Sequence, residues 1–191
     1  YAIHSLAWDL NSQGKRTEAE ALSREEVAIW RRLFGNEDPR VAWALGDLTV
    51  FLRDQGKDSE AETTVREALE IRRKQLAGGR LGLASELHSL AWVLSHQGKQ
   101  AEAQELIGEE LAMRRKLQGK EHPAVATTLY HLAIFLNAQG KYSEAETAIR
   151  QSLAIRKATF GELHREVEVM LGFLARVLQD QRKLAEAETV W

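Results

Sequence analysis

The sequence predicts an all-α array of stacked helix pairs, built from a unit of 42 residues that recurs along the whole chain. One observation is a Gln-Gly-Lys motif at fixed spacing, whose glycines are Gly14, Gly56, Gly98 and Gly140. The altered copy Gln181-Arg182-Lys183 follows at the next step, and a Glu-Ala-Glu type of segment begins four residues after each of these five positions. A fixed period of this size without insertions indicates a stacked repeat array, in which each unit contacts only its neighbours.

The first helix of each repeat is predicted from apolar residues on one helical face. In three successive repeats leucine occupies the same columns: Leu45, Leu48, Leu52, Leu87, Leu90, Leu94, Leu129, Leu132 and Leu136. This i, i+3, i+7 spacing is typical of an amphipathic helix. The glycine that follows is expected just beyond the helix end, because glycine enters the left-handed conformation without a Cβ clash.

The second helix of each repeat is expected to begin with a capping box, in which Ser or Thr is followed three residues later by Glu. The pairs are Thr17 with Glu20, Ser59 with Glu62 and Ser143 with Glu146. Ala101 and Ala185 lack the hydroxyl, so we expect those two helices to start less firmly. The second helices end on basic clusters such as Arg72-Arg73-Lys74, where cations complement the helix dipole.

The unbroken repeat predicts a single domain over residues 1–191, made of about four and a half repeats. The expected repeats are 1–38, 39–80, 81–122, 123–164 and 165–191. We expect both ends to be truncated, with a missing helix covering Val190 and Trp191. The segment Ala77-Gly78-Gly79-Arg80-Leu81-Gly82 is irregular and is expected to be a flexible loop between repeats. A phosphate-binding loop would require a strand, Lys and Ser/Thr context that this segment lacks.

Composition excludes several classes of partner and site. The formal net charge is −2, from 26 basic and 28 acidic residues, which favours neither nucleic acid nor an anionic membrane as partner. The sequence contains no cysteine, so disulfides and thiolate metal sites are excluded, and a cytoplasmic location is expected. No apolar run approaches the ~18 residues of a membrane span.

Catalytic and metal-binding motifs are missing from the sequence. It contains no nucleophile elbow, His-Glu-x-x-His motif, P-loop or dinucleotide fingerprint, and its paired acids recur at helix starts in every repeat. His88, His96 and His131 lie on adjacent first helices, but no pair has the i, i+4 spacing that would direct two imidazoles at one ion. We therefore expect a protein that is not an enzyme and has neither cofactor nor metal. His122 and His164 share a loop column and are expected to cap helices or form turns.

These repeats resemble the tetratricopeptide repeat. The resemblance lies in the turn glycine, the alanine five residues later and small residues in the seventh column, which are Ala7, Ala91, Ala133 and Ala175. The segment from His122 to Leu129, followed by Leu132-Ala133 and Gln139-Gly140-Lys141, is similar to the repeat of kinesin light chains. The near-identical tandem units also resemble bacterial kinesin light chains, some of which accompany bacterial tubulins. The resemblance implies a right-handed superhelical solenoid that binds other proteins.

The resemblance and helical geometry together imply that the first helices line a concave face. The candidate contact residues are His4, Trp8, Asn11, Asp47, Val50, Arg53, His88, Trp92, Ser95, Tyr130, His131, Ile134, Asn137, Phe173, Arg176 and Gln179. Trp8 and Trp92 share a column, and each is either a binding anchor or a packing residue between helices. Trp30 replaces the arginine of its column and is expected to be an exposed apolar contact on the outer surface.

One departure from the kinesin light chains concerns the paired asparagines that those proteins direct at a bound peptide. Their columns hold His4-Ser5, Gly46-Asp47, His88-Ser89, Tyr130-His131 and Gly172-Phe173 in this chain. The cargo-peptide specificity of that family is therefore not expected to transfer. The sequence predicts a scaffold or adaptor whose partner is a protein, either a peptide segment or a tubulin-like filament surface. The alternative is a regulatory or sensor domain of a larger protein.

Overall fold

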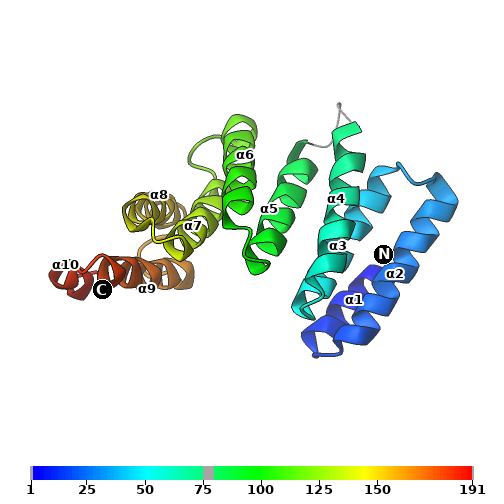
Figure 1. Ribbon diagram of the computed structural model, residues 1–191, viewed down its shortest axis with the longest axis horizontal. Coiled ribbons are helices and arrows are strands. Elements are labelled where there is room, and N and C mark those ends of the chain that lie inside the picture. Colours follow the sequence, from blue (N-terminus) through cyan, green and yellow to red (C-terminus); the bar gives the residue numbers. More distant parts are fainter. Residues whose placement is uncertain (1, 75–79, 191) are drawn as a thin grey trace. The chain divides into compact units, whose positions relative to one another are not determined.

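The computed structural model describes residues 2–74 and 80–190, and every regular element within these ranges is an α-helix (Figure 1). The helices are α1 (Ala2–Ser12), α2 (Arg16–Phe34), α3 (Pro39–Asp54), α4 (Asp58–Lys74), α5 (Arg80–His96), α6 (Gln100–Gln118), α7 (Pro123–Ala138), α8 (Tyr142–Phe160), α9 (Arg165–Asp180) and α10 (Leu184–Glu188). The chain divides into two compact units, Tyr1–Lys99 and Gln100–Trp191. Trp191 and the Ala77-Gly78-Gly79 part of the expected loop lie outside the described residues. The loop prediction is wrong for Arg80–Gly82, which form the first turn of α5.

The first unit contains α1–α5, and each helix packs against the next one in the chain. The predicted leucine columns form its core, since Leu45, Leu48 and Leu52 of α3 are buried. The small residues Ala7 and Ala61 are also buried, where they permit close approach of paired helices. Burial of this single apolar stripe on each helix, worth about 25 cal/mol per Å² of apolar area, holds the pairs together.

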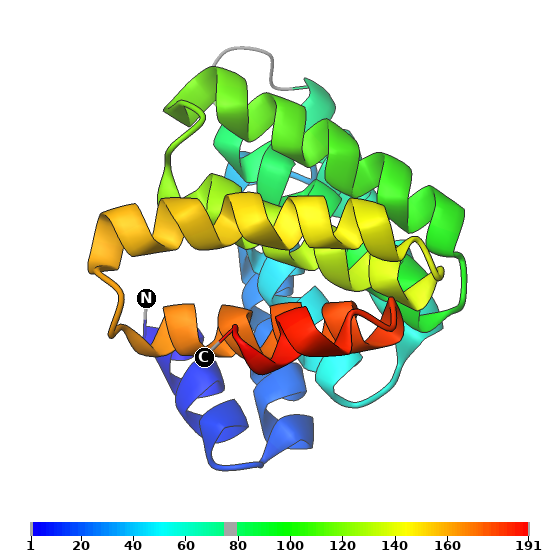
Figure 2. The same cartoon turned by 90° about the vertical axis from the view of Figure 1, so that its left-hand side faces the viewer.

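The second unit contains α6–α10 and repeats the same packing (Figure 2). Leu129 and Leu136 of α7, Ile149 of α8 and Leu174 of α9 belong to one continuous buried cluster. Val190, expected from the sequence to lie under a missing helix, is partly buried against this cluster.

The turn between the two helices of a pair follows the predicted geometry. Gly14, Gly56, Gly98 and Gly140 all have positive φ angles, between 72° and 79°. At the end of α3, the Gly56 amide donates to the Arg53 carbonyl (2.9 Å) and the Lys57 amide to the Leu52 carbonyl (3.0 Å). These two bonds define a Schellman motif, which satisfies carbonyls that the helix end would leave unpaired. Arg182 holds the same place in the last copy at φ 62°, where a side chain is strained.

The predicted capping boxes are wrong. α2 begins at Arg16 and α8 at Tyr142, so Thr17 and Ser143 lie inside the first turn, and the capping residues Lys15 and Lys141 make no side-chain cap. The reason is that the glutamate of the motif binds the next repeat rather than its own helix start. Glu20 accepts from Gln55 (2.8 Å) and lies 2.7 Å from the Lys57 ammonium.

The Gln-Gly-Lys motif therefore connects consecutive repeats. Its glutamine side chain donates to a backbone carbonyl 39 residues earlier in four repeats, pairing Gln55 with Arg16, Gln97 with Asp58, Gln139 with Gln100 and Gln181 with Tyr142. Its lysine reaches the side chain 37 residues earlier, which is Glu20, Glu62, Gln104 or Glu146. The fixed offsets explain why these residues recur together along the chain.

Three of the first helices, α3, α7 and α9, begin with side-chain caps. Asp38 accepts from the Arg40 amide at the start of α3, and the Nδ1 atoms of His122 and His164 accept from the Ala124 and Glu166 amides. The prediction that both histidines are capping residues is confirmed.

Candidate functional site

A pocket of about 290 Å³ opens between α3 and α5 in the first unit. We call it the α3–α5 pocket; its lining residues are Trp43, Gly46, Asp47, Val50, Arg72, Gly82, Ser85, Glu86 and Ser89. Two glycines open this space. A Cβ on Gly46 would lie 3.2 Å from a Glu86 carboxyl oxygen, and a Cβ on Gly82 would lie 2.8 Å from the Arg72 guanidinium carbon. Because neither position carries a side chain, both charged groups face the opening.

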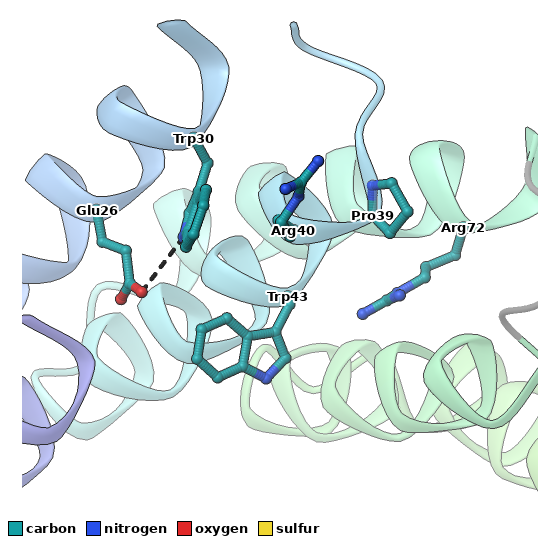
Figure 3. A pocket seen from close by; sticks show the side chains of 6 residues that line it. All are labelled: Glu26, Trp30, Pro39, Arg40, Trp43 and Arg72. Carbon is teal, nitrogen blue, oxygen red and sulfur yellow. Dashed lines mark hydrogen bonds between the residues drawn. The ribbon is translucent and has the colours of Figure 1, made fainter. Parts of the chain in front are cut away.

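A second pocket, of about 320 Å³, adjoins the first through the shared residues Trp43 and Arg72 (Figure 3). Its other lining residues are Glu26, Trp30, Pro39 and Arg40. The prediction that Trp30 is an exposed contact on the outer surface is wrong. Trp30 is half-buried against the core of this unit, and its indole N–H donates to Glu26 over 3.3 Å.

The carboxyls of the α3–α5 pocket are electrostatically unusual. Burial raises the pKa of Glu86 from its ordinary 4.5 to about 7; the charge of Arg72 opposes this rise and that of Asp47 adds to it. Burial also raises the pKa of Asp47, against the charge of His4. The two acids thus repel each other in a site that is poorly hydrated.

Several predicted contact residues of the first unit cluster beside this pocket. His4 Nδ1 lies 3.0 Å from Asp47 Oδ2, and the His4 ring lies 4.3 Å from the Trp43 ring between centroids. Trp8 is 38% exposed, yet its ring meets buried Phe51 edge-on at 5.1 Å. Trp8 therefore has a packing role in addition to an exposed surface.

The other predicted residues of the first unit lie on α1, α3 and α5. Val50 is half-buried and lines the α3–α5 pocket, and Arg53 is half-buried with its guanidinium 3.6 Å from Asp54. Trp92 is half-buried, and its indole N–H donates to His88 Nε2 over 3.1 Å. Further along these helices, Asn11 donates to Asp54 over 3.2 Å.

The predicted residues of the second unit form two contacts between α7 and α9. Tyr130 meets Phe173 edge-on at 5.5 Å, and Asn137 donates to Asp180 over 3.1 Å. The Asn137 bond repeats the Asn11–Asp54 bond of the first unit, three repeats earlier. His131 lies beside Tyr130 at 5.5 Å, and Arg176 is exposed on α9. Aromatic and basic groups therefore occur together on the first helices of this unit too.

The family model described as tetratricopeptide repeat matches four overlapping stretches, residues 2–74, 50–116, 83–158 and 124–190. The chain belongs to the tetratricopeptide repeat family. The predicted fold class, an all-α solenoid of antiparallel helix pairs, is thereby confirmed, and the longer unit of 42 residues is a variant of the family's usual 34. None of the curated protein sequences matches the chain.

Solved structures resemble nearly the whole chain, and two of the three described below are of the kinesin-light-chain type. A point variant of a Podosopora anserina protein, described as a putative kinesin light chain with nearly identical TPR-like repeats, is 26% identical with a TM-score of 0.86, over 99% of this chain and 89% of that one. BtubC (BKLC) from P. vanneervenii is 21% identical with a TM-score of 0.85, over 98% and 75%. The apo form of RapI, 13% identical, shares the fold with a TM-score of 0.78 over 98% and 50%. The predicted kinesin-light-chain resemblance is confirmed.

The tetratricopeptide repeats and these neighbours support a protein–protein interaction scaffold, a use of this fold that is typically non-catalytic. Within residues 2–74 and 80–190, no three potential metal ligands gather at one place, and no helix is both long and apolar enough to cross a membrane.

Sequence reasoning missed three residues of the site: Trp43, Arg72 and Glu86. Trp43 and Glu86 differ from the residues at the equivalent positions of other repeats. Trp43 corresponds to Ser85 and Thr127, and Glu86 corresponds to Thr128 and Met170. A search of the columns for a charged residue among uncharged ones would have found Glu86. Arg72 matches Arg114 and Arg156 in its column and carries no such signal.

Proposed function

We propose that this chain is a cytoplasmic scaffold that binds an extended segment of a partner protein along its first helices. The observation that carries the proposal is the α3–α5 pocket, whose lining residues come mainly from the first helices α3 and α5 and include the predicted contact residues Asp47 and Val50. Exposed aromatic rings flank it, since Trp8 and Trp43 are each 38% exposed. Aromatic rings beside a partly apolar pocket are the usual anchors of a protein interface.

The proposed contact residues extend over both units. In the first they are His4, Trp8, Asp47, Val50, Arg53, His88 and Trp92, and in the second they are Tyr130, His131, Asn137, Phe173 and Arg176. They alternate with the buried leucine columns on the same helices, so substitution at solvent-accessible positions such as Arg53 and Arg176 should change binding more than folding.

The test is affinity capture with the tagged chain, identification of the bound protein, and measurement of its affinity for purified variants. Trp92→Ala and Arg53→Glu should each weaken binding about tenfold or more, because interface anchors often contribute over ~2 kcal/mol. Glu25→Ala, an exposed position on the second helix α2, is the matched control and should bind normally. If all three variants bind like the unmodified chain, the first-helix face is not the interface.

The identity of the captured protein distinguishes the narrower alternatives. A tubulin-like filament, suggested by the bacterial kinesin-light-chain resemblance, would co-sediment with the chain. A regulatory role would instead be indicated by binding to an effector domain or to a disordered segment of it. The two outcomes differ in the partner and share the same contact face.

A further inference from the structure

Glu86 is a buried carboxyl to which no donor bonds within the described part of the chain. Its side chain belongs to a residue only 5% exposed, and it lines the α3–α5 pocket. Its carboxyl oxygens lie 3.2 and 3.3 Å from the point that a Cβ on Gly46 would occupy, so the lack of a side chain there leaves room for the carboxyl. A desolvated carboxyl is stabilised by a hydrogen-bond donor, so a donor group that enters the pocket would interact favourably with Glu86.

The equivalent positions of the next two repeats show what Glu86 lacks. Forty-two residues later, Thr128 donates to Glu110 over 2.9 Å. One repeat further, Met170 accepts from Ser152 over 3.3 Å. The residue at the position of Glu110 and Ser152 in the preceding repeat is Ala68, which is buried and has no polar side-chain atom. Glu86 therefore has no polar residue at the position that supplies the partner of Thr128 and Met170.

The charges around the pocket favour a cationic ligand. Asp47 and Glu86 line it, and the cation among its lining residues is Arg72. Asp47 already interacts with His4, whose Nδ1 lies 3.0 Å from Asp47 Oδ2, so Glu86 is the principal acceptor for a ligand. In the adjoining pocket Glu26 brings a third carboxyl. Arg40 adds no free charge there, because its guanidinium is bonded to Asp38 over 2.7 and 2.8 Å.

Trp43 supplies an aromatic ring on which a bound cation could stack. It is 38% exposed and lines both pockets, so its indole is accessible at the point where they meet. Figure 3 shows the Arg72 side chain extending toward Trp43 from the other side of the opening. An exposed indole beside carboxylates attracts a flat cation through both its ring quadrupole and stacking.

We propose that the α3–α5 pocket binds an arginine side chain of the partner segment, whose guanidinium donates to Glu86 and Asp47 and stacks on Trp43. This proposal rests on the proposed function, because the arginine belongs to the segment bound along the first helices. Arginine fits better than lysine, since its planar fork can donate to two carboxyls at once while its face lies on an aromatic ring.

The first experiment titrates the full chain with the peptide acetyl-Gly-Arg-Gly-amide and follows the indole N–H resonance of Trp43 by NMR, assigned with Trp43→Phe. The peptides with lysine, citrulline or glutamate at the central position are the matched probes. The arginine peptide should shift the Trp43 resonance saturably, and the neutral citrulline peptide should not. Glu86→Gln and Asp47→Asn should each weaken the arginine peptide about tenfold or more. Asp180→Asn, an equal change of charge on α9, should leave it unchanged.

Three results would overturn the proposal. They are the lack of a saturable shift with arginine, an equal or larger shift with the lysine or glutamate peptide, and undiminished binding to Glu86→Gln. Glu86→Gln removes a buried charge, so we expect it to fold, and its melting temperature checks this directly.

The second experiment separates this proposal from the proposed function by selecting random short peptides displayed on phage against the full chain. Selection of peptides with arginine at one constant position, lost in Glu86→Gln, supports both proposals. Selection of peptides without that arginine supports the interaction scaffold and overturns the arginine pocket. If no peptide is selected while the NMR titration succeeds, the arginine pocket is supported and the peptide-binding scaffold is contradicted.

Discussion

The ammonium of Lys183 lies 2.8 Å from a carboxylate oxygen of Glu146, 37 residues earlier in the chain. Gln181 donates to the same oxygen over 2.9 Å, and Arg150 donates to the other one over 2.8 Å. The bond to Lys183 is the main reason why the pKa of Glu146 falls to about 2, below its ordinary 4.5. The contact joins one repeat to the next, so it stabilises the array rather than a single helix.

Glu146→Gln should therefore destabilise the chain in a pH-dependent manner. The folded-state pKa lies below the unfolded value, so the stabilisation is fully present above pH 4.5 and is lost as the pH falls toward 2. We expect a loss of about 1 kcal/mol at pH 7, since the partners are partly exposed, and a smaller loss at pH 3. Urea denaturation at both pH values measures it. Glu144→Gln, in the first turn of the same helix, is the control, and a loss independent of pH would contradict the explanation.

Two glycine-to-alanine substitutions, one in a turn and one within a helix, should have opposite effects on stability. Gly140 has a φ of 75°, and a Cβ at this position would lie in open space, so Gly140→Ala should destabilise by roughly 1 kcal/mol through backbone strain alone. Gly108, in the middle of α6, is equally uncrowded but has ordinary helical geometry. Gly108→Ala should stabilise by roughly 0.5–1 kcal/mol. Thermal unfolding of both variants checks the pair, and equal shifts of the two would contradict the assignment.

Arg182→Gly tests the same conformation in the last copy of the turn. Arg182 has a φ of 62° and makes the same two Schellman bonds through its own and the following amide. Glycine relieves the strain of the left-handed conformation, so the variant should be about 1 kcal/mol more stable. A lower midpoint in thermal unfolding would show that contacts of the Arg182 side chain stabilise the fold by more than the strained backbone conformation destabilises it.

Much of this fold could be predicted because the repeat places the same kind of residue at the same structural position. Leu48 and Gly56 are examples: a helical stripe and a left-handed turn are local properties, and both are confirmed. The pattern assigns Glu20 to its own helix start because a capping box is also local. Besides Arg24 on its own helix, its partners are Gln55 and Lys57, which only packing between repeats brings to it.

The candidate site was harder to predict because it depends on contacts between helices, which the sequence of a single helix does not show. Asp47 and Val50 can be recognised from their place on a first helix, and both line the α3–α5 pocket. Glu86 was missed because its importance depends on two absences on other helices, the side chains of Gly46 and of a polar residue at Ala68. The hydrophobic pattern of α5 itself gives no information about the residues at positions 46 and 68 on the neighbouring helices.

Glu86→Gln should make the chain more stable at neutral pH. The folded-state pKa of Glu86, about 7, lies above the ordinary 4.5. Ionisation of Glu86 therefore lowers the stability of the unmodified chain as the pH rises from 4.5 through 7. The shift corresponds to at most about 3 kcal/mol, and the advantage of the variant should grow across this window and disappear near pH 4.5. Denaturation at pH 4.5, 6 and 8 measures it.

The matched control is another buried glutamate with the opposite expectation. Glu110 is 1% exposed and is bonded to Arg114 and Thr128, so its charge is compensated. Glu110→Gln should destabilise the chain at pH 8, because it weakens a buried charge-assisted bond to Arg114. If both variants are destabilised to the same extent at pH 8, then burial of the Glu86 charge is not unfavourable.

The last prediction separates packing from binding for the two tryptophans of one column. Trp8 packs edge-on against buried Phe51, so Trp8→Ala should cost about 2 kcal/mol of folding stability, less than the ~3–5 kcal/mol of a fully buried tryptophan. Under the proposal that Trp92 is a binding anchor, Trp92→Ala should weaken partner capture while leaving the melting temperature almost unchanged. Circular dichroism melts of both variants, combined with the capture assay, decide this. If Trp92→Ala unfolds the array or leaves capture intact, Trp92 is a packing residue, and the proposed contact face loses its principal anchor on α5.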